Sequence, residues 1–380
     1  MRLKKLLIAA LASLAVTTAH AAGLKFIQIP ADAAGPAIDA AMWSPCASPP
    51  GEVKVKQSTV PAVLDCPIEG GRLPLVVISH GYGGWYLDLH DMAETLADAG
   101  FVVVAINHPH ANHADMSQAN GLGVLRQRPI DIKRTIDFML GNSADSAKID
   151  PQRVGFYGFS QGGYTGLVIG GADPDFNKLP PRCSNPADTG CPPANQPKPA
   201  SKQLPPETLT QDTRVKAIVV ADPLSVVFQT ADSVENVKVP LQLWSSQFGG
   251  DAVSPVDVKR LAGLLPRTPD FHVVPNAVHL SFLTPCPADD ARKPSPACID
   301  APGFDRVAFH KAFNAAVLAF FRQHLAEDQD HGAKTPAPGH EAAETAVQRS
   351  DCRAFHANPV SASTKRSRAS TGASGNGTIS

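Results

Sequence analysis

Short apolar runs, separated by polar residues, glycine and proline, recur through the middle of the chain. They have the length of strands that are buried on both faces of a sheet. These runs cover residues 73–79, 101–106, 154–157, 215–221, 239–244 and 271–274. Between some of them lie segments with apolar residues at helical spacing, such as 88–99, which ends before Gly100, and 129–140. This alternation predicts an α/β fold with a mostly parallel central sheet and helices on both faces.

The chain ahead of this core has a weaker pattern. Residues 25–29 and 53–55 predict short edge strands before the main sheet. The chain between them contains Trp43, Cys46 and several prolines, and it predicts irregular surface structure. We therefore expect the regular core to begin at Leu73.

Residues 1–21 have the form of a secretory signal peptide. The first five residues include three basic side chains, and residues 6–16 form an apolar run that is too short to span a bilayer. Ala19-His-Ala21 then fits a cleavage site between small residues. No later segment has an apolar run of transmembrane length. We expect a periplasmic or secreted protein without a transmembrane segment.

Charge and low-complexity segments complete the predicted domain plan. The formal net charge is −1, so nothing indicates nucleic-acid binding. Residues 173–212 are rich in proline and are either a lid above the C-terminal ends of the strands or a solvated insertion remote from the site. Residues 326–380 are rich in Ala, Ser, Thr and Gly and are predicted to be disordered. The folded domain is therefore expected to span residues 22–325.

The seven cysteines gain meaning from the predicted export, because disulfides persist in oxidising compartments. Six of them form pairs of neighbours along the chain, and we expect each pair to be bonded. The pairs are Cys46 with Cys66, Cys183 with Cys191, and Cys286 with Cys298, and Cys352 is left over in the tail. A zinc site is the alternative, but no two cysteines have C-x-x-C spacing.

One motif organises the chemistry. The strand at 154–157 runs into Gly158-Phe-Ser-Gln-Gly162, and a helical segment follows at 164–170. A G-x-S-x-G sequence between a strand and a helix is the nucleophile elbow of an α/β-hydrolase, a sharp turn that presents a serine hydroxyl at the end of a sheet. The pentapeptide alone is common, and its strand–helix context makes the assignment specific. Ser160 is therefore the predicted nucleophile.

A nucleophilic serine needs a base, and the chain order in this fold is serine, acid, histidine. His279 follows the last predicted strand, where a loop can bring it over the elbow. His272 lies within that strand, and His310 lies on the final helix. We therefore predict His279 as the base.

Two aspartates compete to orient this histidine. Asp222 and Asp251 both follow strands between the serine and the base, and either one could instead be a turn or helix-cap residue. Pro223 restricts Asp222 to extended backbone, whereas Asp251 lies in a glycine-led loop. We prefer Asp251 as the acid and keep Asp222 as the alternative.

Two backbone N–H groups are expected to form the oxyanion hole. One belongs to Gln161, the residue after the nucleophile, and the other to Tyr82, in the loop after the strand at 73–79. Glycines on both sides of Tyr82 let this backbone approach the elbow, and the His80 side chain is expected to hold the loop.

Three histidines are concentrated at 107–113. A metal site would use such spacing, but Asp115 is the one nearby carboxylate. We favour a loop on the rim of the substrate cleft and predict neither a metal nor a cofactor.

Three segments together carry a resemblance to known proteins: Ile-Ser-His-Gly-Tyr-Gly-Gly at 78–84, Gly-Phe-Ser-Gln-Gly-Gly at 158–163 and Ala-Val-His-Leu-Ser-Phe at 277–282. They resemble the bacterial predicted dienelactone hydrolases, which lie near the platelet-activating factor acetylhydrolases and, more distantly, the cutinase-like polyester hydrolases. The resemblance runs from about residue 70 to 325 and implies an α/β-hydrolase fold. True dienelactone hydrolases have a cysteine nucleophile, and Ser160 departs from that pattern.

The resemblance also bears on the acid. Acetylhydrolase-like members keep it at the position that matches Asp222. Cutinase-like members and many of the bacterial group keep it at the position that matches Asp251, and this sequence has an aspartate at each.

Two functions follow from these observations. The first is a secreted serine hydrolase that cleaves carboxylic esters of small-molecule or lipid-like substrates through an acyl-enzyme on Ser160. The second is a non-catalytic protein of the same fold that binds a hydrophobic ligand, because a fold alone does not imply activity. A serine, acid and histidine in the expected order favour the enzyme.

Overall fold

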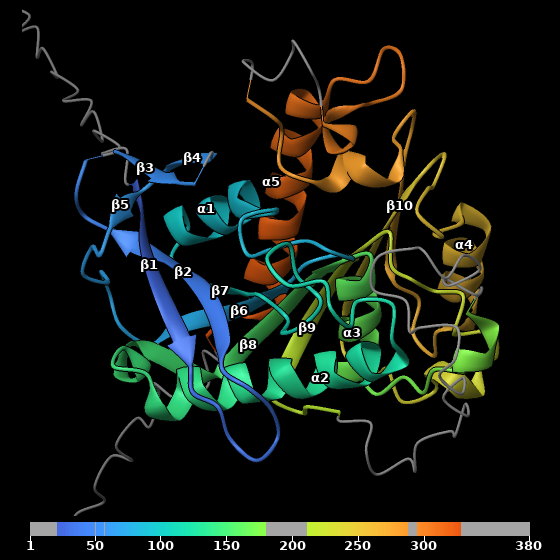
Figure 1. Cartoon of the computed structure of the whole chain (residues 1–380), viewed down its shortest axis with the longest axis horizontal. Helices are drawn as coiled ribbons and strands as arrows, with labels where there is room; N and C mark the ends of the chain where they lie inside the picture. The colour runs from blue at the N-terminus through green and yellow to red at the C-terminus, as the bar shows by residue number, and fades with distance from the viewer. Residues whose placement is uncertain (1–20, 50, 57, 180–210, 288–294, 328–380) are drawn as a thin grey trace, which may run out of the picture. The chain divides into compact units, whose positions relative to one another are not determined.

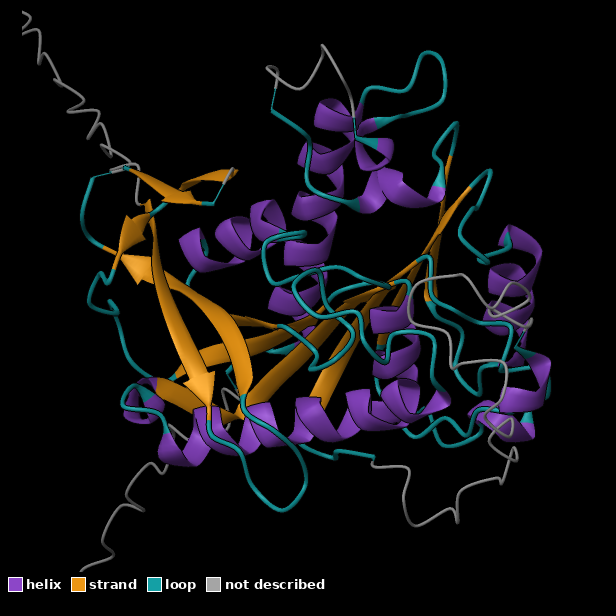
Figure 2. Ribbon diagram, in the orientation of Figure 1, coloured by secondary structure: helices purple, strands orange, loops and turns teal. Residues whose placement is uncertain are grey.

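The computed structural model of this protein describes residues 21–49, 51–56, 58–179, 211–287 and 295–327. A central sheet is covered by helices on both faces (Figures 1 and 2). Nearly all of the predicted signal peptide, most of the proline-rich insertion and the tail lie outside the described residues. The expectations for those segments therefore stay predictions.

The central sheet has nine strands, and its larger part is parallel. In order across the sheet they are β11 (Asp270–Val274), β10 (Leu241–Ser246), β9 (Val215–Ala221), β8 (Ile149–Phe159), β6 (Leu73–Ser79), β7 (Val102–Ile106), β2 (Ile38–Cys46), β1 (Ala21–Ile29) and β5 (Val63–Leu64). From β11 to β7 all neighbours are parallel, whereas β2 is antiparallel to both β7 and β1. The carboxyl ends of the parallel strands therefore meet at one edge, where this class of sheet carries its sites. A separate small sheet pairs β3 (Glu52–Val55) with β4 (Ser58–Pro61).

The N-terminal part of the sheet corrects three expectations. The regular core begins at β1 rather than at Leu73, and β1 is a nine-residue strand between β2 and β5 rather than a short edge strand. The segment with Trp43 and Cys46, predicted to be irregular, forms the nine-residue strand β2 inside the sheet. Its apolar residues do not alternate with polar ones, because helices and neighbouring chain cover both faces and Trp43 is fully buried. The small and polar residues Asp39, Ser44 and Pro45 hide the pattern. Pairing with β1 and β7, which local sequence does not encode, makes this segment a strand.

Among the described residues, five α-helices cover the two faces of the sheet. Helices α1 (His90–Asp98) and α5 (Arg306–His324) pack on one face, and α2 (Leu122–Asp137), α3 (Gln161–Ile169) and α4 (Pro255–Leu264) pack on the other. Short helical turns lie at Phe138–Asn142, Ser146–Lys148, Phe176–Lys178, Asp232–Val234, His279–Phe282 and Pro296–Cys298. In the part of the chain that the structure describes, no helix combines the length and apolar character that a bilayer crossing requires.

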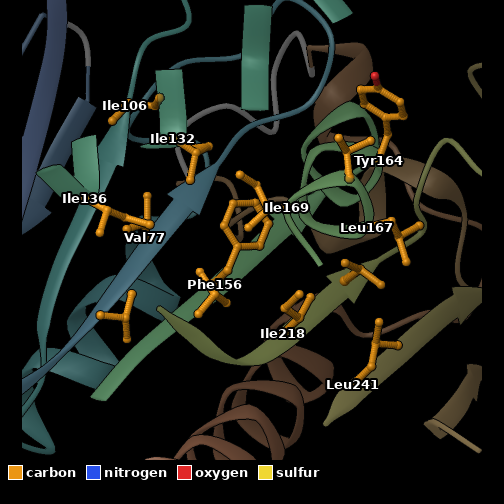
Figure 3. Packing of buried hydrophobic residues seen from close by; sticks show 14 of the residues in the cluster. Val77, Ile106, Ile132, Ile136, Phe156, Tyr164, Leu167, Ile169, Ile218 and Leu241 are labelled. Carbon is orange, nitrogen blue, oxygen red and sulfur yellow. The ribbon is translucent and has the colours of Figure 1, made fainter. Parts of the chain in front are cut away.

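The apolar core lies between the sheet and these two layers. Val77 of β6 points to the layer of α2 and α3, and its neighbours Val76 and Ile78 point to the layer of α1 and α5. This alternation follows from the two-residue period of a strand. Figure 3 shows Ile132 of α2 and Leu167 of α3 among the strand side chains of the first layer. Burial on both faces explains why the strands have continuous apolar sequences.

Helix α2 begins earlier than predicted, at Leu122 rather than Pro129. Pro129 lies inside the helix and has no N–H for the carbonyl oxygen of Leu125. The hydroxyl of Tyr164 on α3 donates to that oxygen instead, at 3.2 Å. A contact from another helix therefore satisfies the group that the proline leaves without a partner.

Two of the three predicted disulfides are present in the described residues. Cys46 bonds to Cys66, and Cys286 bonds to Cys298. The third predicted pair and Cys352 lie outside the described residues. The Cys286–Cys298 disulfide closes a loop that begins seven residues after the predicted base, His279.

Removing the Cys286–Cys298 disulfide is expected to destabilise the domain. The two residues are 12 positions apart, and closing a loop of that length contributes about 3 kcal/mol in the chain-entropy model. The double variant Cys286→Ser/Cys298→Ser should lose about that much free energy of unfolding in urea titrations. Cys352→Ser, which removes the cysteine predicted to have no partner, is the control, and an equal loss in both variants would contradict the assignment.

Candidate active site

Ser160 occupies the sharp turn between β8 and α3, as the elbow motif predicts. Its backbone has φ 56° and ψ −114°, which is strained for a residue with a side chain. A Cβ atom on Gly162 would lie 1.9 Å from the backbone oxygen of Ser79, and one on Gly158 would lie 2.2 Å from the backbone oxygen of Gly162. Only glycine fits at these two positions, so the close approach of β6, β8 and α3 holds the turn in its strained form.

His279 lies directly beside this serine. It begins the helical turn His279–Phe282 in the chain after β11, and its side chain is buried. Its Nε2 atom is 2.9 Å from the Oγ atom of Ser160. The ring stacks on Phe159, with 4.7 Å between the ring centroids. The structure thus brings together the serine and the histidine that the sequence analysis selected.

Asp222 is the carboxylate that faces the histidine. It follows β9, is fully buried, and places Oδ2 3.0 Å from Nδ1 of His279. Ser246, at the end of β10, holds both carboxylate oxygens: its N–H donates to Oδ1 at 2.7 Å, and its hydroxyl donates to Oδ2 at 2.5 Å. A carboxylate at Nδ1 fixes the hydrogen on that nitrogen. Nε2 is then the atom that can accept the proton of Ser160.

The structure does not bring Asp251, the aspartate preferred from the sequence, to the histidine. Its side chain is exposed, and the contact from its loop to the base comes from the backbone: Gly249 accepts a hydrogen bond from the N–H of His279 at 2.8 Å. The argument from Pro223 fails because Asp222 is not extended. It has φ 43°, in the left-handed region that aspartate tolerates better than most residues. The sequence contains no local signal for this conformation.

Ser246 is a site residue that the sequence analysis missed. It is the second of two serines, Ser245 and Ser246, at the carboxyl end of β10, and polar residues there look like a strand end. The signal that was available is its position, since β10 is the neighbour of β9, which delivers Asp222. Its hydroxyl also accepts the N–H of Gly249 at 3.0 Å. One serine therefore links Asp222 to the loop that contacts His279.

The loop after β6 reaches the elbow where the oxyanion hole is expected. A Cβ atom on Gly81 would lie 3.2 Å from Cβ of Ser160. Gln161 is the first residue of α3, where backbone N–H groups point away from the helix. Tyr82 follows Gly81, and its hydroxyl donates to Asn120 at 2.9 Å. The backbone of both predicted donors thus lies next to the serine in sequence or in space.

Contacts to two helices hold the segment that carries His279. His310 of α5 lies with Nε2 2.9 Å from the carbonyl oxygen of Ser281 and with Nδ1 2.7 Å from Asp91 of α1. The hydroxyl of Thr284 donates to the same carboxylate at 2.6 Å. The histidine on the final helix therefore has a structural place, as its position in the sequence indicated.

The three histidines at 107–113 contact different partners. His108 is buried between Ser79 and Asp131, His110 faces Asp115 at 2.8 Å, and His113 lies against Trp85. Within the described ranges, no group of three or more His, Cys, Asp or Glu side chains could hold a metal ion.

Asparagine variants distinguish the two candidate acids. Asp222→Asn should lower the rate at which a fluorophosphonate labels Ser160 by at least about 100-fold, because an amide no longer fixes the tautomer of His279. Asp251→Asn is the matched control and should label within about twofold of the native protein, because its carboxylate is exposed. The labelling rate constants give the answer, and the reverse ranking would contradict the assignment of Asp222.

The Asp91 carboxyl should make the free energy of unfolding depend on pH in the acid range. Burial raises the pKa of this carboxyl, but hydrogen bonds from His310, Thr284 and Asn314, with the His310 charge, outweigh burial and lower the pKa to about 2. An aspartate in the unfolded chain titrates near pH 3.9. Asp91 should therefore contribute roughly 2–3 kcal/mol to the free energy of unfolding above about pH 4, and this contribution should be lost as the pH falls towards 2.

The test compares denaturation of the native protein with that of Asp91→Asn at several pH values. The stability difference between them should shrink as the pH falls from 4 to 2. Asp145→Asn, which breaks a surface ion pair with Lys25, should show a difference below about 1 kcal/mol throughout. A difference for Asp91→Asn that does not change with pH would contradict this account.

Comparisons with known proteins were made for the sequence and for the structure. A family model described as BD-FAE matches residues 65–188, about a third of the chain. A search of curated proteins finds no match. Among solved structures, a dienelactone hydrolase from Anabaena variabilis is 14% identical, with a TM-score of 0.46 over 80% of this chain and 99% of that chain. A cold-adapted esterase from an Arctic intertidal metagenomic library is 15% identical, with a TM-score of 0.40 over 79% of this chain and 92% of that chain.

A ferulic acid esterase from Streptomyces cinnamoneus gives a stronger structural likeness. It is 17% identical, with a TM-score of 0.57 over 87% of this chain and 96% of that chain. At this identity the likeness concerns the fold. The mostly parallel sheet, the helices on both faces and the strand–serine–helix turn agree with it. This chain has the α/β-hydrolase fold.

Proposed function

We propose that this protein is an exported serine hydrolase that cleaves carboxylic esters. One observation carries the proposal: Ser160, His279 and Asp222 form a continuous chain of hydrogen bonds at the carboxyl edge of the parallel strands. The matched family and the ferulic acid esterase named above support ester substrates. A complete set of this kind also favours catalysis over the alternative of a ligand-binding protein.

The reaction has two halves. In the first, Nε2 of His279 takes the proton of Ser160 while Oγ attacks the ester carbonyl carbon, and the protonated imidazole is stabilised by Asp222. The tetrahedral oxyanion accepts hydrogen bonds from the backbone N–H groups of Gln161 and Tyr82. The histidine then returns the proton to the leaving alcohol, and an acyl-enzyme remains.

In the second half, water attacks the acyl-enzyme. His279 takes a proton from the water, a second oxyanion forms in the same place, and the proton returns to Ser160 as the carboxylic acid leaves. The serine, the base and the donors of this scheme all belong to this chain.

The position of the acid bears on the kind of esterase. Asp222 follows β9, and in the resemblance to known hydrolases this is the place that acetylhydrolase-like members use. Cutinase-like members, and many of the bacterial predicted dienelactone hydrolases, use the place that Asp251 occupies here, on an exposed loop. The geometry therefore favours an acetylhydrolase-like relationship over a cutinase-like one.

Ser160→Ala tests the proposal. Hydrolysis of p-nitrophenyl butyrate should fall by at least about 1,000-fold, because loss of the nucleophile typically costs several orders of magnitude. A series of p-nitrophenyl esters from acetyl to palmitoyl gives the acyl preference in the same assay. Ser233→Ala is a control, since Ser233 precedes β10 and lies away from the carboxyl edge. A Ser160→Ala variant with more than a few per cent of native turnover would contradict the proposal.

A further inference from the structure

A fully buried arginine lies beneath the loop expected to carry the oxyanion donor. Arg128 of α2 has no exposed surface. Its Nη2 atom donates to the carbonyl oxygen of His80 and to the hydroxyl of Ser79, the latter at 3.2 Å. Its Nε atom donates to Thr165 of α3 at 3.1 Å. One guanidinium therefore joins the oxyanion loop to the helix that follows the nucleophile.

Around it lies a second serine–histidine–aspartate chain. Nε2 of His108 is 2.9 Å from the hydroxyl of Ser79, and Nδ1 is 2.9 Å from Asp131. The connectivity matches that of the active site, but Ser79 is completely buried, so no substrate reaches its hydroxyl. The chain instead forms part of a polar framework under the loop.

His80 connects this framework to the loop. Its Nδ1 atom is 2.7 Å from the carbonyl oxygen of Gly81, and its Nε2 atom accepts the N–H of His108 at 3.2 Å. Both contacts are satisfied when the neutral ring carries its hydrogen on Nδ1. Burial, together with the charge of Arg128, holds the pKa of His80 well below its usual value, which maintains that neutral form.

Peptide geometry turns these contacts into a constraint on catalysis. The peptide unit between Gly81 and Tyr82 is planar, so its C=O and N–H groups point in opposite directions. When His80 holds the carbonyl of Gly81, it also fixes the direction of the Tyr82 N–H. Arg128 donates to the preceding carbonyl oxygen, that of His80. The two buried side chains therefore fix the orientation of two consecutive peptide planes.

We propose that Arg128 is a positioning residue that orients the Tyr82 N–H towards the oxyanion, acting through the backbone carbonyl of His80 and the neutral His80 ring. This inference rests on the proposed esterase activity and adds a residue that does not touch the substrate. It accounts for a guanidinium that the fold holds at a cost: burial lowers the pKa of Arg128 to about 9, and its Nη1 atom has no hydrogen-bond partner among the described residues.

The chain offers a matched control on the same helix. Arg134 is also buried, but its guanidinium holds the segment before β2, through the carbonyl oxygens of Pro30, Gly35 and Pro36. Its Nη1 atom also lies 3.8 Å from Asp131, so its removal controls for the loss of a cation beside that carboxylate. Arg128→Met and Arg134→Met remove the same group from the same helix, and only the first change touches the oxyanion loop. Arg128→Lys restores one cationic donor to the first position.

The experiment measures kcat and KM for p-nitrophenyl butyrate and amide hydrogen exchange of the peptide that contains residues 80–84. Arg128→Met should lower kcat by about 10- to 100-fold, a fraction of the loss on removing an oxyanion donor, with KM within about threefold. Exchange in the 80–84 peptide should become faster. Arg128→Lys should recover part of kcat, and Arg134→Met should keep kcat within about twofold even if it unfolds at a lower temperature.

The outcomes separate this inference from the proposed function. An inactive native protein would overturn both. An active native protein would overturn the positioning role alone if Arg128→Met kept its kcat, if Arg134→Met lost as much, or if the 80–84 peptide exchanged at the native rate. Should Arg128→Met fail to fold, Arg128→Lys decides: full native kcat with native exchange would overturn the role, and a reduced kcat with faster exchange supports it.

Discussion

The strained backbone at Ser160 is the constraint on which the rest of the site depends. A positive φ at a serine is unfavourable by itself. At Ser160 it persists because the surrounding chain leaves no room for another backbone conformation. Gly162 lies against the carbonyl of Ser79, and Gly158 lies against Gly162, so β6, β8 and α3 approach at distances that only glycine allows. The apolar strands and the buried face of α3 provide the stability that maintains this contact.

Asp222, at the end of the neighbouring strand β9, also has a strained backbone. Its backbone is left-handed, and Pro223 after it packs where a Cβ atom on Gly163 would lie 2.7 Å away. Both residues sit immediately after buried parallel strands, and both point their side chains to the carboxyl edge. Two local conformations that are unfavourable on their own thereby place a serine hydroxyl and a carboxylate on opposite sides of one imidazole.

The supports of the site come from both layers of helices. Helices α1 and α5 hold the segment of His279 through Asp91 and His310, whereas α2 reaches the oxyanion loop through Arg128. His310 and Arg128 each contact a backbone carbonyl oxygen of a loop at the carboxyl edge, those of Ser281 and His80. The buried polar groups therefore act on the loops that must be precise, while the apolar core between the layers gives the fold its stability.

Local sequence determined much of this molecule. Continuous apolar runs identified the parallel strands, glycine spacing identified the elbow at Ser160, and the order of elements selected His279, because these features depend on short-range sterics and on burial. Strand β2 was missed, since its small and polar residues become a strand only through pairing with β1 and β7. Which of Asp222 and Asp251 lies beside His279 was decided only by the tertiary structure. It depends on which strand end faces the imidazole, and that requires the packed positions of β9, β10 and the His279 segment, which lie far apart in the sequence.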